Sequence, residues 1–208
     1  MNRYDGRPHD GAPAMIDAAS LFLHVLAAVG ILGGAACQVL AGDRLRQAAT
    51  TAEVNMWGRF TRTLGRLVAT SAVVSLLTGG HLAGAVWTTE TTSGFSRPFI
   101  TLGAAALLLL VPVGPMVGGR RLRLLIDSAS ASTADGRADP DRLAMAAADP
   151  VLWGAVHSLV GVAVGLVAVM VYKPGWAVTA MLLLATFAAG WGSGVVVAVR
   201  SDGSSSRP

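Results

Sequence analysis

Charged residues are scarce in this chain, and long stretches contain none. Only 13% of the 208 residues are Asp, Glu, Lys or Arg, whereas about 25% is usual in soluble domains. The shortage is concentrated in extended apolar segments rather than spread along the chain. This pattern argues against a soluble globular domain and indicates an integral membrane protein.

Cysteine and the familiar enzyme motifs are also nearly or wholly missing. The single cysteine, Cys37, excludes an intramolecular disulfide, and we expect it to be a small packing residue within the first apolar segment. The chain has no Walker loop, no GxSxG, no HExxH and no GxGxxG. All acidic residues fall outside the apolar segments, which argues against a carboxylate proton relay through a membrane.

Five uncharged segments are each long enough to cross about 30 Å of hydrocarbon at 1.5 Å per residue. They are residues 18–42, 67–89, 98–119, 150–172 and 174–199. In lipid only helices and closed barrels satisfy every backbone polar group, and the period-two alternation of barrel strands is absent. The predicted fold is therefore all-α, a polytopic membrane protein with five transmembrane helices.

The basic residues predict the orientation of these helices. Twelve of the sixteen lie in segments 43–66, 120–149 and 200–208, and four lie on the other side, at Arg3, Arg7, Arg97 and Lys173. The positive-inside rule then places the N-terminus outside and the C-terminus in the cytoplasm. Because the arginines sit in short segments between apolar runs, we expect no nucleic-acid partner.

The segments outside the spans are expected to differ in character. Residues 1–17 form a polar extracytoplasmic N-terminus, 43–66 and 120–149 are cytoplasmic loops, and 200–208 form a disordered tail. In the first loop, apolar side chains recur at three- and four-residue spacing, at Trp57, Phe60, Leu64 and Val68. This spacing predicts a basic amphipathic helix on the inner membrane surface that leads into the second span; a plain loop is the alternative.

Two histidines inside the spans are the strongest candidates for chemistry. The stretch SLFLHVLAAVGILGG places His24 six residues from the outer end of the first span, and His81 lies eight residues from the outer end of the second. Both are then roughly 9–12 Å deep at the helical rise. Ionisable residues at such depth are functional-site hypotheses by default. Two imidazoles at matched depth on neighbouring helices suit the axial positions of haem b, or two ligands of a copper or zinc ion.

This hypothesis has accompanying residues and an alternative. Arg97 and Trp87, near the outer boundary, are candidate contacts for haem propionates. Without a CxxCH motif, any haem would be held non-covalently. The alternative is that His24 and His81 only hydrogen-bond to Ser, Thr or carbonyl groups and hold the bundle together.

The remaining singled-out residues are assigned structural roles. His157 lies in the opposite half of the membrane and is expected to pack. Gly161 and Gly165 form a GxxxG pair that permits close helix approach. Pro112 and Pro115 each remove a backbone donor and are expected to kink the third span, with lining a cavity as the functional alternative.

Short apolar motifs carry a family resemblance over most of the membrane region. LHVLAAVGILGG, LLTGGHLAG and VMVYKPGW resemble segments of the predicted integral membrane proteins of domain-of-unknown-function family 2269. The first motif also resembles the first helix of CopD copper-resistance proteins and of HemJ-type protoporphyrinogen oxidases. The HemJ likeness implies that His24 is a haem ligand, and the CopD likeness places it near copper handling.

The sequence therefore predicts a multi-pass protein of the cytoplasmic membrane that binds haem b or a metal ion, in electron transfer or metal handling. Two alternatives stay open. One is a non-catalytic accessory or assembly subunit of a larger membrane complex or homo-oligomer, bound through small-residue helix faces. The other is a small-solute transporter that uses the proline-broken third span.

Overall fold

The computed structural model describes residues 11–113, 119–130 and 149–204, and these form helices joined by short connections, with no strand among them. Helix α1 (Gly11–Arg46) and helix α2 (Thr51–Ala85) form an antiparallel pair. At the turn between them, the Thr50 side chain accepts from the Glu53 backbone N–H, and the Glu53 carboxylate accepts from the Thr50 N–H. This capping box starts α2 sharply after α1. The all-helical prediction is confirmed.

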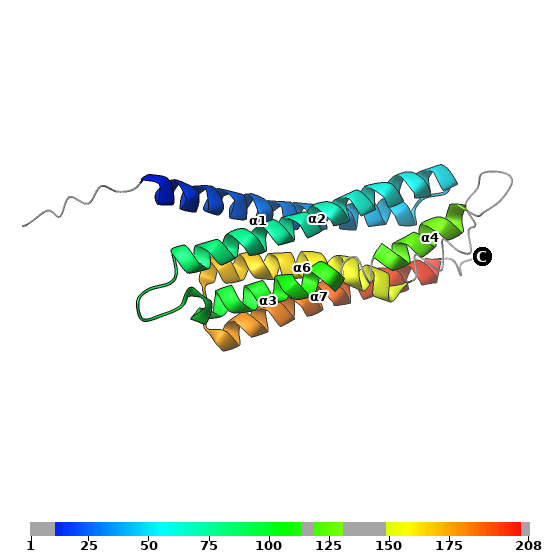
Figure 1. Cartoon of the computed structure of the whole chain (residues 1–208). Helices are drawn as coiled ribbons and strands as arrows, with labels where there is room; N and C mark the ends of the chain where they lie inside the picture. The colour runs from blue at the N-terminus through cyan, green and yellow to red at the C-terminus, as the bar shows by residue number, and fades with distance from the viewer. Residues whose placement is uncertain (1–10, 114–118, 131–148, 205–208) are drawn as a thin grey trace, which may run out of the picture.

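The second half of the chain forms a second antiparallel pair beside the first (Figure 1). A short 3₁₀ turn, η1 (Gly94–Ser96), leads into α3 (Pro98–Val113), which is followed by α4 (Arg120–Ser130). Helices α6 (Pro150–Tyr172) and α7 (Trp176–Ser204) are joined by three residues, of which Lys173 adopts the left-handed conformation with φ of 47°. Contacts between α1 and α6 join the two pairs.

Four of these helices are long and apolar enough to cross a membrane, namely Ala14–Arg46, Thr51–Ala85, Pro150–Tyr172 and Trp176–Arg200. The protein is thus a helical membrane protein. Within the third expected span, 98–119, the structure describes helix α3 over Pro98–Val113. Its 16 residues span about 24 Å at the helical rise. The expected kink at Pro115 falls outside the described residues.

Helix α6 occupies the centre of the bundle. In its apolar window 56% of the residues are buried, against 11% in the windows of α1 and α7, which therefore present most of their surface to lipid. The main core joins α1, α2, α3 and α6 through nine side chains: Ile31, Ala35, Val68, Ala72, Leu107, Leu159, Val162, Ala163 and Leu166. Packing across four helices fixes their relative positions, and with them the shape of any site between them.

The helices extend further than the uncharged segments predict. Helix α2 begins 16 residues before the expected start at Leu67, so the expected surface helix and the second span are one continuous helix. The reason is tertiary, because α2 buries Val54, Gly58 and Thr61 in this region and Ile126 of α4 packs directly on Gly58. At the other terminus α7 continues to Ser204, into the segment expected to be a disordered tail.

One end of the bundle collects most of the described arginines, and we call it the arginine-rich end. There α1 ends, α2 begins, and α4, the start of α6 and the end of α7 lie together (Figure 1). A separate apolar cluster stabilises this end through Leu45, Ala48, Val54, Leu122 and Ile126, with Trp57 against it. Helix α4, which begins the expected loop 120–149, is therefore packed on the α1–α2 pair; residues 131–148 lie outside the described part.

Candidate functional site

His24 lies in the seam between α1 and α2 and is fixed by hydrogen bonds. Its Nδ1 is 3.1 Å from the carbonyl oxygen of Ser75 and 3.2 Å from Oγ1 of Thr78. A carbonyl only accepts, so Nδ1 carries the hydrogen and donates it. The Thr78 hydroxyl donates to the Val74 carbonyl, which leaves its oxygen free to accept from the imidazole. In the neutral ring, Nε2 then keeps its lone pair.

Glycine makes room for this imidazole. A Cβ at Gly79 would stand 3.0 Å from Cε1 of His24, closer than side chains normally approach. Polar groups of α2 thus face α1, and the Ser75 carbonyl and the Thr78 hydroxyl position His24. A histidine that donates Nδ1–H to a carbonyl has the orientation common among metal-binding imidazoles.

His81 lies in the same seam but has a different partner. Its Nε2 is 2.9 Å from Oδ1 of Asp17, and both side chains are partly exposed. On α1, Asp17 is seven residues before His24, which is about 10 Å along the helix axis. Each histidine therefore binds a residue of the opposite helix, and among the described residues no hydrogen bond or shared partner joins the two. Within the described ranges, no group of three or more His, Cys, Asp or Glu is placed to hold a metal ion.

The predicted propionate contacts lie at the end of the bundle opposite the arginine-rich end. Arg97 is exposed at the end of η1, where its backbone N–H donates to the Gly94 carbonyl. Trp87 packs edge-on against Phe99 with 5.3 Å between ring centroids, and Nζ of Lys173 lies 4.8 Å from a Trp87 ring centroid. Trp87 therefore joins the ends of α2, α3 and α6.

His157, Gly161 and Gly165 all lie between α6 and α7. Nδ1 of His157 is 3.0 Å from Oγ of Ser193, whose hydroxyl donates to the Gly190 carbonyl, so the imidazole is the donor of the first bond. A Cβ at Gly161 would overlap the Thr186 carbonyl, and one at Gly165 would overlap the Thr186 hydroxyl. These residues allow close packing of the second helix pair.

A cavity of about 220 Å³ lies between α1, α2, α4 and α6 toward the arginine-rich end, and we call it the inter-pair cavity. Sequence reasoning did not identify it. Its described lining consists of Gln38, Gly42, Leu45, Thr61, Arg62, Gly65, Arg66, Val68, Ala69, Ala72, Gly119, Leu122, Arg123, Leu152, Trp153, Ala155, Val156 and Leu159. The wall is mostly apolar, with a few polar groups, which is the usual composition of a small-molecule site.

Two buried polar side chains of this wall have unused hydrogen-bonding atoms. Gln38 is 7% exposed and Thr61 6% exposed. The Gln38 amide donates to the Thr61 carbonyl at 3.4 Å, but Oε1 of Gln38 and Oγ1 of Thr61 have no partner among the described residues. An unsatisfied buried polar group costs about 1–3 kcal/mol, so each such atom needs an explanation. Both oxygens are covered by neighbouring atoms, so a ligand in the cavity reaches them only after a side-chain movement.

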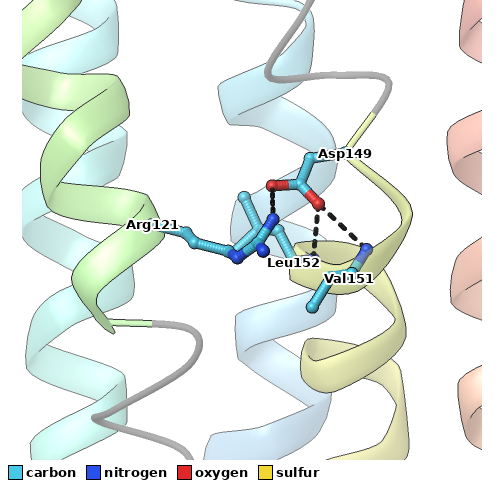
Figure 2. Close-up of polar contacts among 4 residues, drawn as sticks. All are labelled: Arg121, Asp149, Val151 and Leu152. Atoms are coloured by element: carbon cyan, nitrogen blue, oxygen red, sulfur yellow. Dashed lines mark hydrogen bonds and ion pairs between the residues drawn. The ribbon is translucent and has the colours of Figure 1, made fainter.

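Helix α4 forms one wall of the cavity and is tied to α6 (Figure 2). Nη1 of Arg121 lies 2.5 Å from Oδ2 of Asp149, and Oδ1 of the same carboxylate accepts from the backbone N–H groups of Val151 and Leu152. Asp149 is thus both the N-cap of α6 and the anchor of α4. On another face of α4, Leu122 packs in the apolar cluster of the arginine-rich end.

The double role of Asp149 leads to a stability prediction. We expect Asp149→Ala to lower the free energy of unfolding by about 1–2 kcal/mol, because it removes the cap from two backbone N–H groups. Arg121→Gln removes only a partly exposed ion pair and is expected to cost at most about 1 kcal/mol. Circular dichroism during a titration from mild to denaturing detergent measures both. Equal losses in the two variants would show that the ion pair, and not the cap, carries the effect.

Comparison of this chain with protein-family models, with curated proteins and with solved structures finds no match. The resemblance of its apolar motifs to family 2269, CopD and HemJ-type proteins therefore stays a prediction. The geometry therefore offers two candidate sites: a histidine oriented in one helix seam, and a cavity lined by arginines and apolar side chains between the two helix pairs.

Proposed function

We propose that the chain crosses the cytoplasmic membrane five times, with its N-terminus outside and its arginine-rich end in the cytoplasm. Helix α2 ends at one end of the bundle and α6 begins at the other, so the chain has to traverse the bundle between them (Figure 1). Helix α3 makes most of that passage. Arg44 and Arg46 in the last turn of α1 and the arginines of α4 lie at the end that the positive-inside rule assigns to the cytoplasm.

We further propose that the protein is a membrane-embedded binding protein that takes up an amphipathic small molecule in the inter-pair cavity. The observation that carries this proposal is the cavity of about 220 Å³ between the two helix pairs, whose mainly apolar wall also contains Gln38, Thr61 and three arginines. The described lining offers amide, hydroxyl and guanidinium groups, and has no carboxylate, imidazole or thiol to serve as a general base. Such a set of groups suits binding and orientation better than acid–base catalysis.

Photolabelling in vesicles tests this proposal. Single-chain amphiphiles that carry a diazirine on the chain, with nonionic, cationic or phosphate heads, are irradiated with the reconstituted protein and the labelled peptides are mapped. We expect saturable labelling of the α2 and α6 segments that line the cavity by at least one of the three. Ala69→Phe, which fills the cavity, should abolish it. Val73→Phe, the same aromatic on an exposed position of α2, should leave it unchanged.

The two substitutions distinguish labelling inside the cavity from labelling on the lipid-facing surface. Labelling that rises linearly with every amphiphile, falls on lipid-facing residues such as Leu77, and responds alike to both variants would refute the binding function. In that case the amphiphiles would only have dissolved in the surrounding bilayer.

A bound haem b or copper ion at His24 is the second candidate function. It is favoured by the Nδ1–H bond to the Ser75 carbonyl, which leaves Nε2 available as a ligand. His81 and Arg97 would belong to the same site only if His81 left Asp17. Absorption spectra of the purified protein, oxidised and dithionite-reduced, test this candidate. A haem spectrum lost in His24→Ala and kept in His157→Ala supports it, whereas colourless, metal-free protein from haem-replete cells refutes it.

A further inference from the structure

The inter-pair cavity is lined by several arginines, and their charge indicates the chemical class of a ligand. Arg62 and Arg66 are four residues apart on α2 and therefore lie on the same face of that helix. Arg123 lines the same cavity from α4. Three arginines from two helices thus line one space of about 220 Å³.

These three arginines have no protein counter-ion in the part of the chain that the structure describes. The ion pairs found there join other residues, including Arg46 with Asp43 and Arg121 with Asp149. Each cavity arginine ends in a planar fork of donors that matches the oxygens of a phosphate or carboxylate. Three such forks around one space repel one another, and an anion between them relieves that repulsion.

The polarity of the cavity wall also changes along its length. Arg66 and Arg123 are exposed, and Arg62 is half-buried, at its arginine-rich side. Val68 and Ala72 on α2, and Val156 and Leu159 on α6, line it further toward the bundle centre and are buried. Thr61 directly precedes Arg62 on α2, so Thr61 and its hydrogen-bond partner Gln38 lie at the arginine side of the cavity. A ligand that matches this order has an anionic head and an apolar body.

We propose that the inter-pair cavity binds an anionic single-chain amphiphile with a phosphate head, held by Arg62, Arg66 and Arg123, whose chain enters between α2 and α6. The inference rests on the proposed binding function and names its ligand class. A phosphate uses three guanidinium groups more fully than a carboxylate does. The volume is below the range of about 300–1,000 Å³ of typical ligand pockets, so it admits a head and part of one chain.

The test compares head groups on one diazirine-labelled chain in the reconstituted protein. We expect half-maximal labelling of the cavity peptides at an at least tenfold lower concentration for the phosphate head than for the nonionic or trimethylammonium heads, since charge-assisted bonds to phosphate are the strongest available here. The variant Arg62→Gln/Arg66→Gln/Arg123→Gln should lose this preference and still be labelled by the nonionic probe, which shows that it is folded. Inorganic phosphate alone should not displace the bound amphiphile.

A charge-matched control distinguishes the site from a general surface effect. Arg44→Gln/Arg59→Gln/Arg120→Gln removes three arginines of the same end that do not line the cavity. If this control loses the preference as fully as the cavity variant, bulk surface charge accounts for it and the proposal is wrong. Complete displacement by inorganic phosphate would assign the site to a free anion and also overturn it. Saturable labelling without preference for phosphate refutes the ligand class and leaves the binding function standing.

Discussion

Gly161→Leu is expected to unfold the α6–α7 pair, with a loss of about 3 kcal/mol or more of unfolding free energy. Any Cβ at this position would overlap the Thr186 carbonyl and stand 3.3 Å from Cα of Gly190. Both are backbone atoms, so no side-chain rotation relieves the clash and the helices have to separate. Separation would also break the His157–Ser193 hydrogen bond between the two helices.

Gly192→Leu is the matched control for this prediction. It lies on α7 in the same helix pair, but a Cβ there meets nothing within 4 Å. We expect little loss of stability from it, because removal of a helical glycine also favours the helix. Circular dichroism during a titration with denaturing detergent compares the two variants. Similar stability of both would contradict the close α6–α7 approach at Thr186.

Trp153→Ala is expected to have the second large effect, a loss of about 3–5 kcal/mol. Trp153 is 2% exposed and packs with Leu152, Val156 and Ala198. The Arg46 guanidinium lies 4.8 Å from its ring centroid, and α1 approaches the ring at Gly42. The substitution removes contacts to α1 and α7, and to neighbours on α6 itself, and it opens the inter-pair cavity.

Trp176→Ala provides the comparison for this loss. Trp176 opens α7 and is 52% exposed, so its removal leaves no internal void. The same detergent titration is expected to show a small change for Trp176→Ala and a large one for Trp153→Ala. A Trp153→Ala protein that is as stable as wild type would mean that α1, α6 and α7 do not meet around this ring.

Much of the fold was predictable from local features of the chain. Uncharged apolar segments have to be helical in lipid, and this identified all four long helices of the bundle. The three-residue connection at Lys173 permits only an antiparallel hairpin, and α6 and α7 form one. The small size of Gly161 and Gly165 predicted close helix approach without any knowledge of the partner helix.

The ends of helices were less predictable, because packing and not hydropathy sets them. Arginines between residues 59 and 66 make the start of α2 resemble a loop or a surface helix. Helix α4 covers this stretch and packs on Gly58, so the helix continues. The surface of α4 that packs on Gly58 lies about 70 positions later in the chain, so a local sequence pattern around Gly58 does not predict this contact.

The partners of the histidines and the existence of the inter-pair cavity were decided only by the tertiary structure. Counting residues from the ends of the spans placed His24 and His81 at similar depth, but helix rotation and register determine that one meets Ser75 and the other Asp17. The cavity arises where Gln38, Thr61, Arg123 and Trp153 of four helices come together. Sequence determined which segments enter the membrane, since each segment meets lipid through its own composition. A site between helices depends on how distant segments pack, and so only the assembled bundle defines it.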